Sequence, residues 1–427
     1  MRGRHTALSD QTDHKPVSSA MSPSEPLRVT TSRRRRRTAI ALLTFAFALS
    51  QFYRTCLAVM APELQHDLGL SPEGFGALSS CFFLSFGLAQ IPVGVLFDRL
   101  GVGRPTAALL LVGTLSAVLF TFASSGPQAM IAQVGLGLAC APVFMGLLHY
   151  AAEILDEADY AKLVSRSNGT GMLGALIATA PLGWASMQFG WRVSMGVAAL
   201  CMAAACIGVW TTVRDQGHAE ARGRSLGSMC LTSLRLLEIR ALWTLLPMCV
   251  AMAAGTAFRN AWGGPYLSHV FHMNAEVRGL GLAFVSFSAF CTAFVLPGLV
   301  RRFDLKPTIG AWSTLSLLAG AALTFFPSAN PYLAVGLMAA LASIGMLHPI
   351  LMAHGRKLFH PSMRGRGLGV MNTFVFLGAA VASWAFGAIA GFGTASGWSA
   401  SSTYSLIFAV ASLTIVAALI PYRVSPR

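Results

Sequence analysis

The sequence predicts an all-α integral membrane protein with twelve transmembrane helices arranged in two pseudo-symmetric halves of six. Three observations support this prediction. The 427 residues are 55% hydrophobic and only 11% charged, with a mean hydropathy of +0.62, whereas a soluble domain carries about 25% charged residues. Apolar stretches recur at about the 20-residue length that a helix needs to cross a bilayer. Several residues also repeat at an offset close to half the chain.

The apolar stretches divide evenly around one polar segment. Six helices are expected in an N-terminal half over residues 38–213, and six in a C-terminal half over residues 241–421, with a cytoplasmic central loop at 214–240. Their boundaries are uncertain by about four residues. The expected spans are 38–61, 75–97, 104–124, 128–151, 162–186, 192–213, 241–267, 277–300, 307–326, 331–354, 367–391 and 400–421.

Both ends of the chain are polar. Residues 1–37 end in five consecutive arginines, and no apolar stretch precedes the first span, so this segment is not a signal peptide. It is predicted to be a disordered basic tail that attaches to anionic lipids. Residues 422–427 form a second short tail. Translation can begin at Met1 or at Met21, and the sequence leaves this open.

The distribution of positive charge predicts the orientation. With the N-terminus inside, 27 of the 31 Lys and Arg residues fall on the inner side, and only Arg192 and Arg278 fall on the outer side. Because positive residues favour the cytoplasmic side, both termini are expected to be cytoplasmic. The net charge of +15 is therefore a signal of topology, and it does not require a nucleic-acid partner.

The chain lacks the motifs of an enzyme. It has no P-loop, which excludes ATP as the energy source, and no catalytic constellation at membrane depth. Its eight cysteines form no CxxC motif and no Cys/His cluster with metal spacing, so they are expected to be packing residues. We therefore expect neither a cofactor nor a metal.

The repeat is visible as matching residues in matching spans. Asn168, Gly174 and Gly183 of the fifth span recur as Asn372, Gly378 and Gly387 of the eleventh, each at an offset of 204. The pair Gly94 and Gly298, at the ends of the second and eighth spans, has the same offset. Secondary transporters are often built from two such halves, with the substrate site between them.

Twelve spans, a central loop and two parallel halves resemble the major facilitator superfamily. The most specific local match is the loop after the second span, which carries Gly94, Asp98, Arg99, Gly101 and Arg104. The resemblance implies that this cluster latches the cytoplasmic side closed during alternating access. The alternative is a plain loop that sets topology. The resemblance also implies a bacterial inner-membrane location, and we expect a monomer.

Two charges lie inside predicted spans, Arg54 in the first and Arg259 in the seventh, at an offset of 205. A charge at the bilayer centre costs about 2.5–3.5 kcal/mol, so it predicts a function. The offset places the two side chains at matching depth in corresponding helices, where they face one central cavity. The planar guanidinium of arginine binds carboxylate or phosphate groups. This placement resembles the organophosphate/phosphate antiporter branch of the superfamily. The alternative is that each arginine binds backbone carbonyls or a neighbouring polar residue.

Helical spacing adds neighbours to this predicted substrate site. Gln51 shares a face with Arg54, Trp262 shares a face with Arg259, and Tyr53 lies one step round the first helix. Asn372 and His348 are further candidates in the eleventh and tenth spans. Alternatively, Tyr53 and Trp262 are interfacial anchors, Asn372 joins helices, and His348 is structural.

All 16 acidic residues lie outside the middle of the predicted spans. Binding of a cationic substrate is therefore not expected. The leading prediction is a secondary transporter, an antiporter or symporter, that moves a small organic anion across the inner membrane with a proton or a counter-anion. The alternative is an exporter of a larger metabolite such as a siderophore or drug. A channel or a transporter-like sensor fits the repeat and the loop less well.

Overall fold

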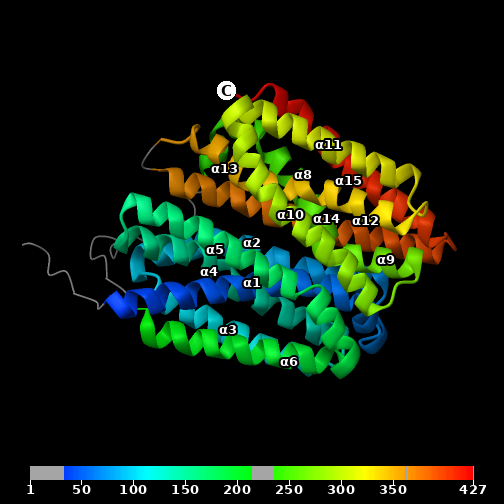
Figure 1. Cartoon of the computed structure of the whole chain (residues 1–427), viewed down its shortest axis with the longest axis horizontal. Helices are drawn as coiled ribbons and strands as arrows, with labels where there is room; N and C mark the ends of the chain where they lie inside the picture. Colours follow the sequence, from blue (N-terminus) through cyan, green and yellow to red (C-terminus); the bar gives the residue numbers. More distant parts are fainter. Residues whose placement is uncertain (1–32, 214–234, 361–362, 427) are drawn as a thin grey trace, which may run out of the picture.

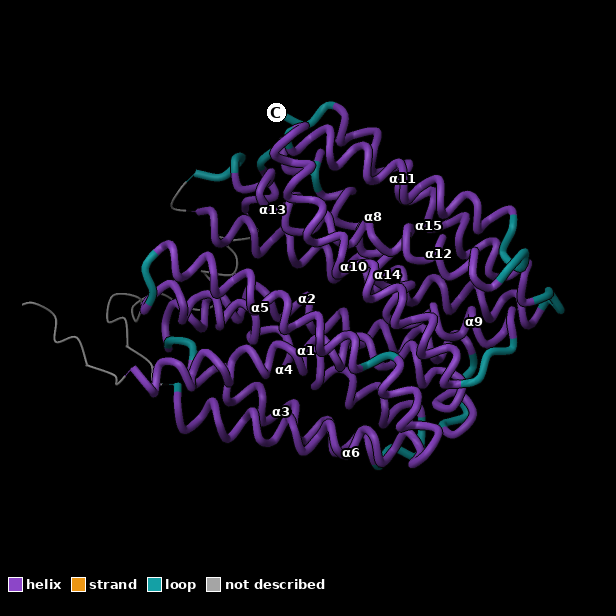
Figure 2. Tube along the Cα trace, viewed as in Figure 1, coloured by secondary structure: helices purple, strands orange, loops and turns teal. Residues whose placement is uncertain are grey.

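The computed structural model describes residues 33–213, 235–360 and 363–426. Every regular element within these residues is helical, which confirms the predicted fold class. The helices form two bundles that lie side by side (Figure 1). Figure 2 shows that the loops gather at the two ends of the bundles. We call the end where the first helix begins and the last helix ends the terminal end, and the opposite end the distal end.

The N-terminal half contains six long helices. Side-chain caps explain two of their starts: Ser71 Oγ accepts from the Gly74 N–H, and Asp156 Oδ1 accepts from the Asp159 N–H. The helices are α1 (Arg33–Asp67), α2 (Pro72–Leu100), α3 (Gly103–Thr121), α4 (Gly126–Ile154), α5 (Glu157–Ile177) and α6 (Ala180–Thr212).

The C-terminal half contains more elements because two of its spans are interrupted. A π-helical turn separates α8 from α9, and a 3₁₀ turn separates α12 from α13. The elements are η2 (Arg235–Glu238), η3 (Arg240–Thr244), α8 (Leu246–Ala257), η4 (Phe258–Trp262), α9 (Gly263–Phe271), α10 (Ala275–Phe303), α11 (Leu305–Phe325), α12 (Pro331–Ala342), η5 (Ser343–Leu347), α13 (His348–Arg356), α14 (Arg364–Ala395) and α15 (Ala400–Arg423).

Eleven segments of the described chain are long and apolar enough to cross a membrane. One of them, Lys162–Thr212, has 51 residues and would extend about 75 Å as a straight helix. The chain turns within this segment at Gly190, whose φ of 81° favours glycine. Counting the segment as two passages gives the twelve spans of the prediction.

Helices extend into parts of the three segments that were predicted to be tails or loop. Arg33–Arg37 form the first turns of α1 rather than a free tail, and Arg35 donates to the carbonyls of Thr211 and Thr212 at the end of α6. Residues 422 and 423 belong to α15, and η2 and η3 occupy part of the expected central loop. The remainder of the predicted N-terminal tail and of the loop lies outside the described residues.

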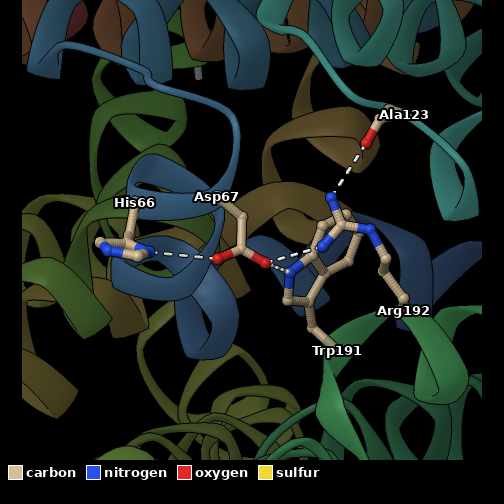
Figure 3. Close-up of polar contacts among 5 residues, drawn as sticks. All are labelled: His66, Asp67, Ala123, Trp191 and Arg192. Atoms are coloured by element: carbon tan, nitrogen blue, oxygen red, sulfur yellow. Dashed lines mark hydrogen bonds and ion pairs between the residues drawn. The ribbon is translucent and has the colours of Figure 1, made fainter.

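A polar cluster joins α1, α6 and the loop after α3 at the distal end of the N-terminal half (Figure 3). Asp67, the last residue of α1, accepts from Trp191 Nε1 at 2.9 Å and from Arg192 Nη1 at 2.7 Å. Arg192 also donates to the Ala123 carbonyl at 3.1 Å, and His66 contacts the second Asp67 oxygen. The cluster thus holds Trp191 and Arg192, the residues directly after the Gly190 turn, against the end of α1 and the loop after α3.

The two halves touch closely at the distal end, mainly through small residues. A Cβ on Gly264 would lie 1.5 Å from the Ala58 carbonyl oxygen, and a Cβ on Gly76 would lie 2.7 Å from Gly387 Cα. Nearby, the hydroxyls of Ser79 and Ser383 are 3.0 Å apart. The absence of side chains at these glycines lets the backbones of α1 and α9, and of α2 and α14, approach each other.

An ion pair crosses the same interface. Arg278 donates to both oxygens of Glu63, at 2.7 and 2.8 Å, and its Nε donates to the Val59 carbonyl at 2.9 Å. The charge count predicts Arg278 on the outer side, and Arg278 lies in the first turn of α10 at the distal end. Its residue is only 2% exposed, because α10 packs against α1 there and the pair connects the halves.

We predict that Gly76→Leu destabilises the contact between the halves. Its Cβ would also lie 2.8 Å from the Ser383 carbonyl oxygen, and such overpacking costs about 1–3 kcal/mol. The measurement is the thermal unfolding midpoint of the purified protein in detergent. Gly336→Leu is the matched control, because a Cβ at Gly336 in α12 has no heavy atom within 4 Å. Equal midpoints for the two variants would contradict the prediction.

Candidate functional site

Arg54 lies on α1 and reaches the interface between the halves. Its Cζ is 4.7 Å from the ring centroid of Phe86 on α2 and 5.0 Å from that of Phe376 on α14, within the range of cation–π attraction. The two ring centroids are 4.1 Å apart, so each half supplies one wall of this aromatic seat. Arg54 Nε is buried without a hydrogen-bond partner. The two terminal nitrogens retain accessible surface and bind no described residue.

Arg259 lies in the π turn η4. The Gly263 N–H donates to the Phe258 carbonyl across this turn, and Pro265 has no N–H to continue the regular pattern. Single π turns often occur at functional sites because they reposition a side chain. Arg259 Nε donates to Asn260 Oδ1 at 3.2 Å, which leaves its terminal nitrogens without a bond to a described residue. The turn η4 packs against α1, the helix that carries Arg54.

Two further predicted residues, His348 and Asn372, contact each other directly. His348 Nε2 is 2.9 Å from Asn372 Oδ1, and Asn372 Nδ2 donates to Gln90 Oε1 at 2.7 Å. The Asn372 oxygen only accepts hydrogen bonds, so His348 must carry its hydrogen on Nε2. Because Gln90 belongs to α2, this series of hydrogen bonds links the two halves. His348 is also within electrostatic reach of Arg54.

Several other polar atoms near these residues have no partner. Gln51 Oε1, Trp262 Nε1 and Asn260 Nδ2 are buried without a hydrogen bond. Trp262 is 1% exposed and packs edge-on against Phe75, with ring centroids 5.5 Å apart. Buried polar groups are usually paired, so such atoms suggest a missing ligand or water.

The prediction for Tyr53 is less well supported by the geometry. Tyr53 is 1% exposed, and the groups that act on it include Cys140 on α4 and Cys201 on α6, within its own half. Its hydroxyl has no partner. The interpretation of Tyr53 and Trp262 as interfacial anchors was wrong for both, because each is fully buried.

The loop between α2 and α3 has the backbone of a tight turn. Gly101 has a φ of 77° and caps α2 through its N–H bond to Phe97, a conformation that favours glycine. Asp98 is exposed and forms no ion pair or hydrogen bond with another described residue. Arg99 is half-buried, Arg104 is the second residue of α3, and Gly94 lies one turn before Asp98. The latch stays a prediction.

The site is positively charged without compensation from an acid. None of the ion pairs among the described residues involves Arg54 or Arg259. Two acids near the distal end pair with other arginines: Glu63 binds Arg278, and Asp67 binds Arg192. Phe86, Phe376, Gln90 and Asn260 were missed by the sequence reasoning, although Phe86 and Gln90, like Asn372 and Phe376, have the four-residue spacing of one helix face.

The chain matches the family model described as Major Facilitator Superfamily over residues 43–383. It belongs to this superfamily. The crystal structure of a mutant of the nucleoside transporter NupG has the same fold, with a TM-score of 0.73, 15% identity, and coverage of 91% of this chain and 99% of that one. This superfamily member is therefore a multi-pass integral membrane protein.

Two relatives from Escherichia coli K12 are also similar in sequence. The probable L-galactonate transporter is 26% identical over 227 residues, or 52% of this chain and 49% of the relative. The hexuronate transporter is 22% identical over 324 residues, or 70% of this chain and 74% of the relative. The chain thus matches about half the length of the first. Both names denote transporters, which supports the expectation that this superfamily member is not an enzyme.

We predict that Asn372→Leu destabilises this superfamily member. The change leaves Gln90 Oε1 and the His348 Nε2–H without their partner, and each unpaired buried group costs about 1–3 kcal/mol. Thermal unfolding in detergent measures the effect. Thr373→Val is the control, because Thr373 Oγ1 bonds only to the Gly369 carbonyl of its own helix. If the unfolding midpoint of Asn372→Leu were no lower than that of the control, the hydrogen bonds of Asn372 to His348 and Gln90 would contribute nothing to stability.

Proposed function

We propose that this protein is a secondary transporter of a small organic anion, of the sugar-acid class, which it moves across the bacterial inner membrane by alternating access. The observation that carries the proposal is the pair Arg54 and Arg259. One guanidinium comes from each half, their terminal nitrogens bind no described residue, and no acid pairs with them. Guanidinium groups bind carboxylates through two parallel hydrogen bonds.

The neutral groups around the arginines suit a hydroxylated substrate. Gln51, Asn260 and Trp262 offer an oxygen and two N–H donors that have no partner. A polyhydroxy acid presents one carboxylate and several hydroxyls, which matches two charged donors and these neutral groups. The names of the relatives include L-galactonate and hexuronate, and both are acids of this class.

The contacts between the halves support alternating access. The close contacts described above run from the distal end to the level of Gln90 and Asn372, and the ribbons of the halves diverge toward the terminal end (Figure 1). The excess of positive residues at that end supports a cytoplasmic location of both termini. We propose that the distal, periplasmic side is closed here, and that Asp98, Arg99 and Arg104 form their latch when the cytoplasmic side closes.

The alternative function, export of a larger metabolite such as a siderophore or drug, has less support. That function would give both arginines a structural role, with hydrogen bonds to backbone carbonyls. Arg278 shows this behaviour at the Val59 carbonyl, whereas Arg54 binds no described polar group and Arg259 binds only the amide oxygen of its neighbour Asn260, through Nε.

We predict that sugar acids raise the thermal unfolding midpoint of the purified protein, whereas the neutral sugar galactose does not. A ligand that binds the folded state stabilises it by mass action. Each of Arg54→Ala and Arg259→Ala should weaken L-galactonate or hexuronate binding by about 10- to 100-fold, because a hydrogen bond to a charged group contributes about 1.5–3 kcal/mol.

Arg302→Ala is the control for this measurement, because Arg302 is exposed at the end of α10 and its guanidinium lies over the neighbouring Phe303 ring. Arg54→Lys retains the charge and removes the planar fork, so it should bind more weakly than the wild type. Stabilisation by neutral or cationic solutes that persists in both alanine variants would refute the anion site and favour the exporter.

Two coupling modes follow from the same charges. In exchange, a counter-anion occupies the two arginines on the return step. In symport, His348 takes up a proton on Nδ1, which has no described hydrogen-bond partner, and Nε2 stays bound to Asn372. Uptake into proteoliposomes separates the two. Exchange predicts that uptake requires internal anion and survives His348→Gln, and symport predicts that a pH gradient drives uptake that this variant abolishes.

A further inference from the structure

A cavity at the terminal end of the C-terminal half is separate from the transport site. It has a volume of about 940 Å³ and is formed by the ends of α10, α11, α13 and α15. Its lining combines positive and apolar side chains. Lys306, Lys357 and Arg423 supply three positive charges, and Asp304 supplies one negative charge. The site therefore has an excess of positive charge and is suited to an anionic group.

One of these positive charges is held in place by the end of the chain. Lys306 Nζ donates to the carbonyls of Arg423 at 2.8 Å and Ser425 at 2.6 Å. An ammonium group has three N–H donors, so one remains for a ligand. His354 fixes the same segment, with Nδ1 3.0 Å from the Tyr422 hydroxyl and Nε2 2.8 Å from the Pro426 carbonyl. The C-terminal residues thus form one ordered wall of the cavity.

One side of the cavity runs between α11 and α15, and we call this part the groove. Gly310 and Thr314 of α11 and Leu419 of α15 line it, and a Cβ at Gly310 would have no heavy atom within 4 Å. The adjoining outer face carries exposed large side chains, with Leu318 63% exposed and Ile420 66% exposed. Such faces of transmembrane helices contact acyl chains, so the groove opens toward lipid.

We propose that this cavity binds one phospholipid with an anionic headgroup. The phosphate lies at Lys306, Lys357 and Arg423, and an acyl chain follows the groove beside Gly310. Basic pockets between transmembrane helices bind acidic lipid headgroups through these interactions. Free phosphate would use the same charges but would leave the apolar groove without a ligand. The proposal is independent of the transported substrate.

The experiment uses the full chain purified in detergent. Native mass spectrometry measures binding of phosphatidylglycerol and of phosphatidylcholine. We expect tighter binding of phosphatidylglycerol to the wild type, and about tenfold weaker binding after the double change Lys357→Gln and Arg423→Gln. The matched control is Arg301→Gln with Arg302→Gln, which removes the same charge from the same end of the half without altering the lining, and it should bind within about twofold of the wild type.

Gly310→Leu tests the groove without any change of charge. The substituent enters open space, so the helix should fold normally, and phosphatidylglycerol binding should fall because the acyl chain loses its place. Undiminished binding in this variant would overturn the groove. If phosphatidylglycerol binding fell equally in the two double variants, the headgroup site would be refuted, because the lipid would then be attracted by the overall positive charge of this end. Displacement of the lipid by millimolar inorganic phosphate would identify a free-anion site instead.

Discussion

Two positive charges without an acid beside them are the constraint on which the rest of the site depends. An unpaired charge inside a membrane-spanning bundle is costly, and most proteins compensate it with a carboxylate. Arg278 is compensated in this way by Glu63, whereas Arg54 has two ring faces and Arg259 has one amide oxygen. These partners lower the cost without consuming the terminal nitrogens. The result is a site that attracts anions and repels cations.

The irregular backbone of the C-terminal half also positions residues of the candidate site. Arg259 belongs to a π turn, and His348 begins the helix that follows a 3₁₀ turn. The two interrupted spans pack on each other, since a Cβ on Gly255 would lie 2.7 Å from the Ile344 side chain. Interruptions at membrane depth are tolerated where the backbone is buried in protein or lines a polar site. The position of both residues at such breaks agrees with a binding role.

Apolar length and charge could be read from the sequence, whereas side-chain direction could not. The spans were predictable because each is a long run of apolar residues, and Arg54 and Arg259 were predictable because a charge in such a run is exceptional. Phe86 and Phe376 could not be identified, since an aromatic residue in an apolar helix is ordinary. The pairing of Arg278 with Glu63 could not be predicted, because it depends on how two helices pack. Tyr53 adjoins Arg54 in sequence, yet it is buried and its hydroxyl has no described partner.

The contacts between the halves are of a kind that can separate, as the proposed function requires. Its closest contacts are made by glycines, which hold helices together by van der Waals packing and lose little when water replaces them. Among the described residues the polar bridges are few: Arg278 with Glu63 and the Val59 carbonyl, Ser79 with Ser383, and Gln90 with Asn372. Each of these groups can be hydrated when the halves part. Arg54 differs, because its aromatic seat includes Phe376 of the other half. An anion held by Arg54 and Arg259 would also bridge the halves, so its binding energy would differ between arrangements of the halves. That difference is what allows a ligand to shift such an equilibrium.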